Sequence, residues 1–203
     1  MQTAEELFQN GLKCLQQSNI DEAVRLFGEA SKKKHAVATF YLAQLHAKDR
    51  FPGANPEAAV ELYTILAKEH NDMQAKFELG VMHCWGKKVQ WNPEEGSKWI
   101  KEFLNDVAAK GVKNLPFACY SELGQLYCNG RMRRSADPVN DVTADDLETA
   151  VLYLKKAVDI ADNSVHPELL KLIKEQIDIQ MKRLSIKKNI AENEAEIRRM
   201  SQG

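Results

Sequence analysis

A short pattern that recurs along the chain constrains the fold more than any other feature of the sequence. Its clearest copy covers residues 75–103, where two amphipathic segments flank a turn. In the first segment, the residues at +4, +5 and +8 from Ala75 share one face of a helix. Gly86 is typical of a helix end, and Asn92 followed by Pro93 is typical of a helix start. The stretch therefore predicts two helices joined as a hairpin.

Further copies of the pattern lie on either side of this hairpin. A shift of 37 residues upstream reproduces both helices and their cap, and the matching residues are Ala38, Leu42, Ala43, His46, Asn55, Pro56 and Glu57. A shift of 44 residues downstream reproduces the first helix at Leu123, Gly124, Tyr127 and Gly130. The second helix resumes near Leu147 with Ala150, after a loop at residues 131–146 in which Thr143 and Asp146 form the pattern of a capping box.

The N-terminal unit is shorter, and its spacing resembles the 34-residue tetratricopeptide pattern. The matching residues are Leu7, Gly11, Ala23 and Phe27. We expect one helix from Thr3, with Glu6 completing a capping box, to about Gln17, and a second from about Asp21 to Lys33. The chain is thus predicted to contain four hairpins, at about residues 1–35, 36–71, 72–110 and 115–163.

No hairpin of this size buries enough apolar surface to be stable alone, so each must cover its neighbour. The predicted fold class is therefore all-α, a right-handed α-solenoid of helical hairpins over residues 1–163. The remaining residues, 164–203, predict a single long helix. Ser164 or His166 with Pro167 marks its start, and neither Gly nor Pro interrupts the run to Met200, which corresponds to about 50 Å of helix.

Two apolar stripes run along this predicted helix. The first is expected to cover the open end of the solenoid, and it comprises Leu170, Ile173, Ile177, Met181 and Leu184. The second is thinner and suits either a free charged helix or docking onto a partner helix, and it comprises Ile186, Ile190, Ile197 and Met200. A strict heptad in phase with Leu170 would place Gln180, Lys187 and Glu194 at alternate core sites, so we do not expect a self-sufficient coiled-coil dimer.

Composition excludes several classes of partner. The 203 residues carry 28 Lys and Arg against 29 Asp and Glu, and the net charge of −1 offers no basic field for nucleic acid or for an anionic membrane. No segment has the roughly 20 apolar residues that a membrane-spanning helix needs, and the N-terminus does not resemble a secretory signal. The four cysteines form no C-x-x-C pair and lack the spacing typical of a secreted disulfide framework, so we expect reduced thiols inside a cell. These features predict a cytoplasmic protein, with the cytoskeleton or the cilium as compatible locations.

The sequence contains no recognisable catalytic constellation. The G-x-G-x-x-G, Walker, H-E-x-x-H and G-x-S-x-G motifs do not occur. His83 and Cys84 are neighbours, but successive residues of a helix point about 100° apart, and neither has a further His or Cys one turn away. We therefore expect no catalytic residue, no metal site and no cofactor.

The recurring pattern, A-x-x-x-L-G-x-x-Y-x-x-G followed by a capped helix that carries Ala and then Trp or Tyr, resembles the Sel1-like repeat, a relative of the tetratricopeptide repeat. The resemblance covers about residues 36–160, with His83 in place of the usual Tyr, Gly96 in place of Ala, and Cys119 in place of the leading Ala. It implies a solenoid fold and a non-catalytic adaptor or scaffold that binds a partner protein or peptide.

Three segments resemble, more narrowly, Sel1-repeat adaptors that attach to the cytoplasmic tail of megalin-type endocytic receptors of the low-density-lipoprotein family. They are QAKFELGVMH, EEGSKWIKEFLND and LPFACYSELGQLYCNG. This likeness implies a receptor tail as the partner. The alternative function is a structural subunit of a large cytoskeletal or axonemal assembly, in which the same solenoid is wedged between larger proteins.

In tetratricopeptide-type solenoids the first helices line the concave face, and this implies a set of candidate binding residues. The position three residues before the helix glycine is occupied by Phe8, Phe40, Phe77 and Ser121, and residues one turn further on are Gln44, Val81, Trp85 and Gln125. The phenylalanines suggest an aromatic ladder for a peptide. Aromatic residues at repeated spacing also pack between hairpins, so the sequence leaves both roles open.

Two further candidates lie in turns. Trp91 precedes a helix cap and is a candidate exposed contact, whereas Trp99 occupies a repeat-core position and is expected to be buried. The loop after the fourth first helix carries Arg131, Arg133 and Arg134, which could bind an acidic tail or a phosphate. The aspartates of the same loop could equally compensate these charges.

Overall fold

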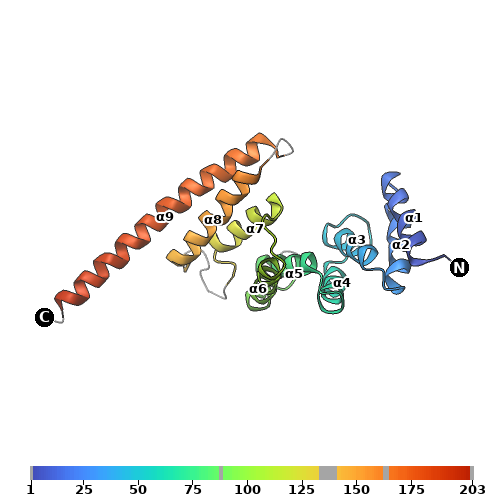
Figure 1. Cartoon of the computed structure of the whole chain (residues 1–203), viewed down its shortest axis with the longest axis horizontal. Coiled ribbons are helices and arrows are strands. Elements are labelled where there is room, and N and C mark those ends of the chain that lie inside the picture. The colour runs from blue at the N-terminus through green and yellow to red at the C-terminus, as the bar shows by residue number, and fades with distance from the viewer. Residues whose placement is uncertain (1, 87–88, 133–140, 162–164, 202–203) are drawn as a thin grey trace. The chain divides into compact units, whose positions relative to one another are not determined.

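The structure is a computed structural model that describes residues 2–86, 89–132, 141–161 and 165–201. These residues form nine α-helices and no β-strand (Figure 1). The helices are α1 (Ala4–Gln16), α2 (Ile20–Lys32), α3 (Ala36–Ala47), α4 (Pro56–Glu69), α5 (Met73–Trp85), α6 (Pro93–Ala109), α7 (Phe117–Cys128), α8 (Ala144–Ile160) and α9 (Pro167–Met200). The predicted all-α class, with helical hairpins and a long C-terminal helix, is confirmed.

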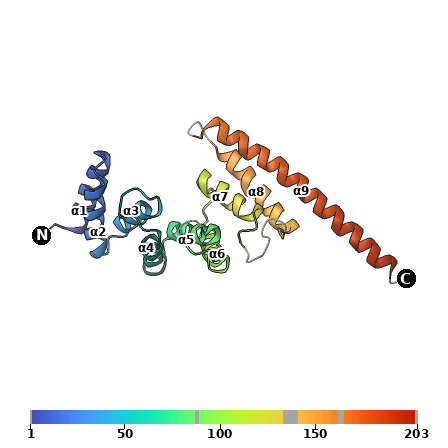
Figure 2. The same cartoon turned by 180° about the vertical axis from the view of Figure 1, so that it is seen from behind.

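The chain divides into two compact units, Met1–Lys110 and Gly111–Gly203. In the first unit, α1 packs on α2, α3 on α4, and α5 on α6, and the second helix of each hairpin packs on the first helix of the next (Figures 1 and 2). In the second unit, α7 packs on α8, and α8 packs on α9. Hairpin stacking of this kind is what the repeat predicted.

The helix ends lie where the capping residues of the sequence placed them. Thr3 caps α1 in a capping box with Glu6, and Thr143 caps α8 in a capping box with Asp146. Asn92 accepts a hydrogen bond from the Glu95 backbone N–H, with proline at the first position of α6. Side-chain acceptors thus satisfy the free N–H groups that begin these helices.

Small residues let the two helices of the third hairpin approach closely. A Cβ atom at Gly80 would lie 2.6 Å from the Ile100 side chain, and one at Gly96 would lie 2.7 Å from the backbone nitrogen of Cys84. Gly86 ends α5 in the left-handed region, at φ 63°. The helix glycines are therefore required by the packing of one backbone against another.

Helix α9 contacts α8 through a face that differs in part from the predicted first stripe. Ile173 and Ile177 pack with Val151 and Leu154 of α8, as expected. Met181 was expected on the same face but is 47% exposed, whereas Gln180 is only 3% exposed. Gln180 is held in place because Arg183 donates to its Oε1 at 2.7 Å and to the Cys128 carbonyl at 3.0 Å. The hydrogen-bonded Gln180 is therefore buried on this face of α9, whereas hydrophobicity alone predicted that Met181 would be buried there.

Candidate partner-binding groove

Two hollows lie between α3 and α5 in the first unit. The smaller, of about 220 Å³, is lined by Ala36, Val37, Phe40, Asp72 and Gln74. The larger, of about 280 Å³, is lined by Ala47, Lys48, Pro56, Tyr63, Glu78, Val81, Met82 and Trp85. Together they follow nearly the whole length of both helices, about 18 Å at 1.5 Å per residue. We call this pair of hollows the α3–α5 groove.

The floor of the groove is aromatic. The rings of Phe40 and Tyr63 meet edge to face, with centroids 5.7 Å apart, so α4 supports the wall that α3 provides. Tyr63 is 1% exposed yet lines the larger hollow. Burial, followed by the charges of Glu78 and Asp72, raises the pKa of the Tyr63 phenol, so the hydroxyl keeps its proton and can donate a hydrogen bond.

Charged groups mark the two ends of the groove. Asp72 caps α5 by accepting from the Ala75 backbone N–H at 2.8 Å, and it lines the smaller hollow. Glu78 accepts from the Gln74 side chain at 3.1 Å and lines the larger hollow. Lys48 lies at the opposite end, just past the last turn of α3. The arrangement is therefore an apolar furrow with acidic groups along α5 and a cation beyond the end of α3.

The described residues hold no cluster of three metal-ligating side chains, and none of their helices is long and apolar enough to cross a membrane. His83, which the sequence places beside Cys84, has a buried Nδ1 atom without a hydrogen-bond partner. Burial raises the pKa of the Cys84 thiol to about 12, so that sulfur is a neutral packing group at ordinary pH. Nothing at this position resembles a ligand set.

Comparison with known proteins identifies the family. The sequence model of the Sel1 repeat matches residues 2–35, 36–71, 74–102 and 118–161, which is more than half of the chain. This chain belongs to the Sel1 repeat family. The match includes the first hairpin, which the sequence alone compared with the tetratricopeptide pattern.

Two solved structures are similar to this Sel1 repeat protein. The crystal structure of a Sel1 repeat protein from Oxalobacter formigenes superposes with a TM-score of 0.53 at 20% identity, covering 78% of this chain and 59% of its own. A protective antigen of uropathogenic Escherichia coli strains, which displays an SLR fold, gives a TM-score of 0.36 at 17% identity, covering 90% of this chain and 44% of its own. The first of these supports the fold. This chain spans 59% of the length of that structure.

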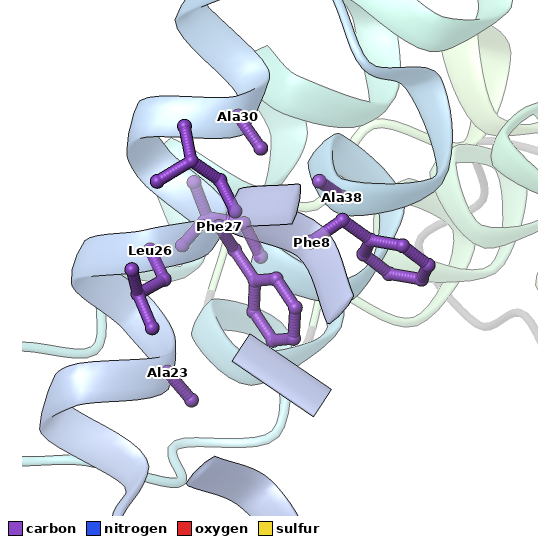
Figure 3. Close-up of a cluster of buried hydrophobic side chains, with 8 residues drawn as sticks. Phe8, Ala23, Leu26, Phe27, Ala30 and Ala38 are labelled. Carbon is purple, nitrogen blue, oxygen red and sulfur yellow. The ribbon is translucent and has the colours of Figure 1, made fainter. Parts of the chain in front are cut away.

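The repeat position three residues before the helix glycine proves to be largely internal. Phe8 is 8% exposed and Phe77 is 5% exposed. The Phe8 ring lies 5.9 Å from that of Phe27 on α2, within the cluster shown in Figure 3, and the Phe77 ring lies 5.0 Å from that of Phe103 on α6. The Phe8 ring also lies 4.8 Å from the His35 ring and 5.7 Å from the Tyr41 ring, so it packs between its own hairpin and the next. Phe40 packs on Tyr63 of α4 but remains half-buried, which leaves part of its ring in the groove.

The residues one turn further on are more accessible. Val81 and Trp85 are half-buried and line the larger hollow, and Gln44 is half-buried on α3. Phe40 thus lines the smaller hollow, and Val81 and Trp85 line the larger one. Ser121 and Gln125 lie on α7 in the second unit, where Ser121 is buried and accepts a hydrogen bond from Gln125 at 3.4 Å.

The candidates in turns have internal contacts. Trp91 is half-buried, its indole N–H donates to the Cys84 carbonyl at 3.1 Å, and its Cβ atom lies against Gly86. Its role in the structure is to hold the α5–α6 turn. Trp99 is 6% exposed, as expected. Arg131 is half-buried, and its backbone N–H donates to Leu126. Arg133 and Arg134 lie outside the described residues.

Sequence reasoning missed other groove residues. Val37, which is 50% exposed, lies one turn before Phe40, and Tyr63 comes from a second helix. The signal for Val37 was its place on the same helix face as Phe40, three residues away. Tyr63 could hardly be predicted from sequence. It lies on α4, the second helix of its hairpin, and only the packing of α4 shows that a second helix also lines the groove.

Proposed function

We propose that this Sel1 repeat protein is a non-catalytic adaptor that binds an extended segment of a partner protein in the α3–α5 groove. Sel1 repeats generally mediate protein–protein interactions, and the chain has four of them. The observation that carries the proposal is the alignment of two apolar hollows along one pair of helices, with polar groups at defined places. Apolar hollows with a few placed polar groups are typical of binding sites.

The dimensions and charges of the groove suggest the chemistry of the ligand. A furrow of about 18 Å accommodates five or six residues of extended chain at roughly 3.3 Å each. The two hollows then accept two apolar side chains of the ligand. A basic residue of the ligand suits Asp72 in the smaller hollow, whereas the larger hollow is lined by one charge of each sign, Lys48 and Glu78. Tyr63 lines the larger hollow with a protonated hydroxyl, which is the kind of group that donates a hydrogen bond to a ligand.

The finer proposal for the partner is the cytoplasmic tail of an endocytic receptor. Its support is the sequence likeness of the segments that begin at Gln74, Glu94 and Leu115, the first of which forms one wall of the groove. This proposal also places the protein in the cytoplasm. The alternative is a structural subunit of a cytoskeletal or axonemal assembly, in which the groove receives a folded neighbour and no short peptide.

A matched pair of surface variants tests the groove. Val37→Glu puts a charge into the smaller hollow, whereas Ile65→Glu puts the same charge on an exposed β-branched residue of α4 that lines neither hollow. Peptides selected from a random display library should bind the native chain in calorimetry. The Val37→Glu variant should weaken that binding by about tenfold or more, and Ile65→Glu should leave it unchanged.

Two outcomes would reject the groove as the binding site. If both variants weaken peptide binding equally, the added negative charge weakens binding wherever it is placed, and the hollow is not the binding site. Failure to select any peptide, together with purification of the native protein only as part of an intact assembly, would favour the structural-subunit function.

A further inference from the structure

Helix α9 carries an apolar stripe that its own unit leaves partly exposed. The side chains are large and hydrophobic, and their exposed fractions run from 42% to 77%: Leu169, Leu172, Ile179, Ile186, Ile190, Ile197 and Met200. The face that packs on α8 is a different one, formed by Ile173 and Ile177 with Gln180 beside them. In Figures 1 and 2 the C-terminal part of α9 extends past α8. The described part of the second unit therefore covers this stripe only in part.

The stripe follows a strict heptad. Alternating steps of three and four residues from Leu169 generate ten positions: Leu169, Leu172, Gln176, Ile179, Arg183, Ile186, Ile190, Asn193, Ile197 and Met200. Seven of the ten are the exposed apolar residues, and this spacing is the signature of a coiled-coil seam. The phase differs from the one that begins at Leu170, whose positions face α8. Single exposed apolar residues are ordinary, whereas a row at seam spacing indicates a missing helix.

We propose that α9 forms an antiparallel coiled coil with α9 of a second copy of this chain. In an antiparallel pair the first position of each heptad on one helix meets the fourth position on the other. Full overlap of the seam places Leu169 opposite Met200, Leu172 opposite Ile197, and Ile179 opposite Ile190 of the second copy. By symmetry every apolar pair occurs twice. The sequence of α9 is thus complementary to its own reverse.

The polar positions of the seam agree with this register. Gln176 falls opposite Asn193 of the second copy, so two amides meet at one level and can bond to each other. The Gln176 Oε1 atom already accepts from Gln180 at 3.1 Å, which leaves its NH₂ group to donate across the seam. A polar pair of this kind fixes register in a coiled coil.

The parallel arrangement is disfavoured by charge. In a parallel pair in register, Arg183 would meet Arg183 of the second copy, and Lys182 would flank Lys187 twice. In the antiparallel pair Arg183 meets Ile186, and its guanidinium is already turned toward the Cys128 carbonyl, 3.0 Å away. The unfavourable contact of the antiparallel pair is Glu175 beside Glu196, which lie at flanking positions. One like-charged carboxylate pair, repeated by symmetry, is the smaller repulsion.

The size of the contact sets the expected affinity. A strip about 50 Å long and 10 Å wide amounts to roughly 500 Å² per chain in projection, less than the about 800 Å² per partner of a standard interface. A hollow of about 340 Å³ lies beside Ile190 next to the seam, and its lining mixes apolar residues with charged ones, among them Asp141, Lys187 and Glu194. We expect a dimer with a dissociation constant in the micromolar range. This inference is independent of the α3–α5 groove, which lies in the other unit.

Sedimentation of the full chain over about a hundredfold range of concentration around the micromolar level tests the dimer. Ile179→Glu puts a charge into the seam, and Met181→Glu puts the same charge on the opposite side of α9 at the same exposed fraction of 47%. The first variant should weaken dimerisation by about 100-fold, and the second should leave it unchanged. Glu175→Lys should tighten the dimer about fivefold, because Glu196 then faces a cation.

Disulfide trapping tests the orientation, with Cys14 replaced by serine to remove the half-buried native thiol. The combined Leu172→Cys and Ile197→Cys variant should cross-link under oxidation, and Ile197→Cys alone should not, since that residue meets itself only in a parallel pair. Cross-linking of the single variant would overturn the antiparallel register. A native chain that stays monomeric throughout, or a dimer that Met181→Glu weakens equally, would overturn the proposed self-association.

Discussion

In the α5–α6 hairpin Leu79, Ile100 and Phe103 are fully buried, and the two backbones approach so closely that Gly80 and Gly96 have no room for a side chain. In α9 one apolar face packs on α8, and a second apolar face of similar length remains partly exposed. Both regions are amphipathic helices with the same kind of periodicity. The difference teaches that periodicity identifies an apolar face, and only packing shows whether the chain itself covers that face.

The largest expected effect concerns a buried ion pair inside the hairpin. Lys76 is 6% exposed, and its Nζ lies 2.6 Å from Asp106 Oδ2 and 2.6 Å from Asn71 Oδ1. Asp106→Ala leaves the ammonium buried without its counter-ion, and we expect a loss of about 3 kcal/mol in the free energy of unfolding of the first unit. Urea denaturation followed by circular dichroism measures it.

The control for this prediction is Lys76→Met, which replaces the ammonium by an apolar group of similar length. Asp106 then loses its counter-ion, but its side chain is 19% exposed against 8% for Lys76, so water can solvate the carboxylate, and the free energy of unfolding should fall by only about 1 kcal/mol. A Lys76→Met cost as large as that of Asp106→Ala would show that the pair stabilises the hairpin by its attraction, contrary to our account.

The hairpins were predictable from sequence because their boundaries depend on local chemistry. Thr3, Asn92 and Gly86 begin or end helices through their own backbone or side-chain preferences, which the sequence displays directly. Whether Phe8 and Phe77 line the concave face or pack between helices was ambiguous from sequence. A residue three before the helix glycine lies at the boundary between the concave face and the packed face of its helix. Which face a neighbour covers depends on the packing of another helix, and this is not written in local spacing.

The same reason explains the misplacement of Met181. Hydrophobicity ranks methionine above glutamine for a buried site, but Gln180 is buried because Arg183 and Gln176 hydrogen-bond to it. The groove was half predictable: Val81 and Trp85 were expected, whereas Tyr63 required the packing of α4 to be known. The apolar residues of α9 were visible, yet Leu172 and Ile179 were not assigned to the second stripe before their exposure was known.

Glycine substitutions test the close packing of α5 against α6. Gly96→Ala places a Cβ atom 2.7 Å from the Cys84 backbone nitrogen and 2.9 Å from the Gly80 carbonyl oxygen, so α5 and α6 must separate. We expect a loss of about 2 kcal/mol in the free energy of unfolding. The measurement is again chemical denaturation.

Gly28→Ala is the matched control, because a Cβ atom at Gly28 would meet nothing within 4 Å. Alanine in the α2 helix should stabilise the unit by about 0.5–1 kcal/mol. If both substitutions destabilise the protein alike, the close approach of α5 and α6 is not what requires Gly96.

The buried thiol of the hairpin predicts a pH dependence. Burial raises the pKa of Cys84 to about 12 from 9.0, so between these values the unfolded chain loses a proton that the folded chain keeps. The contribution of this thiol to stability is therefore complete below pH 9 and is lost as the pH rises from 9 toward 12. Tyr63, whose pKa burial also raises, acts in the same direction above its ordinary value of 10.0.

Cys84→Ala isolates the contribution of the thiol. The free energy of unfolding of the native chain should fall more steeply above pH 9 than that of the variant, whatever the offset between the two at neutral pH. Parallel curves for the two proteins would contradict this assignment. Stability below pH 9 should differ between them only by a constant.

The smallest expected effect concerns the exposed stripe of α9. Two isoleucines of this helix, one buried and one exposed, allow it to be measured. Ile177 is 8% exposed against α8, and Ile186 is 58% exposed on the free stripe. Ile177→Ala removes buried methylene groups and should destabilise the second unit by about 2 kcal/mol. Ile186→Ala should change the stability of the monomer by less than about 0.5 kcal/mol, measured at a concentration well below dimerisation. Because isoleucine is replaced by alanine in both cases, helix propensity changes equally, and the difference between the two values reports the burial of one face alone. A cost at Ile186 close to that at Ile177 would mean that the free stripe is covered within a single chain, and the reason to seek a second helix would then disappear.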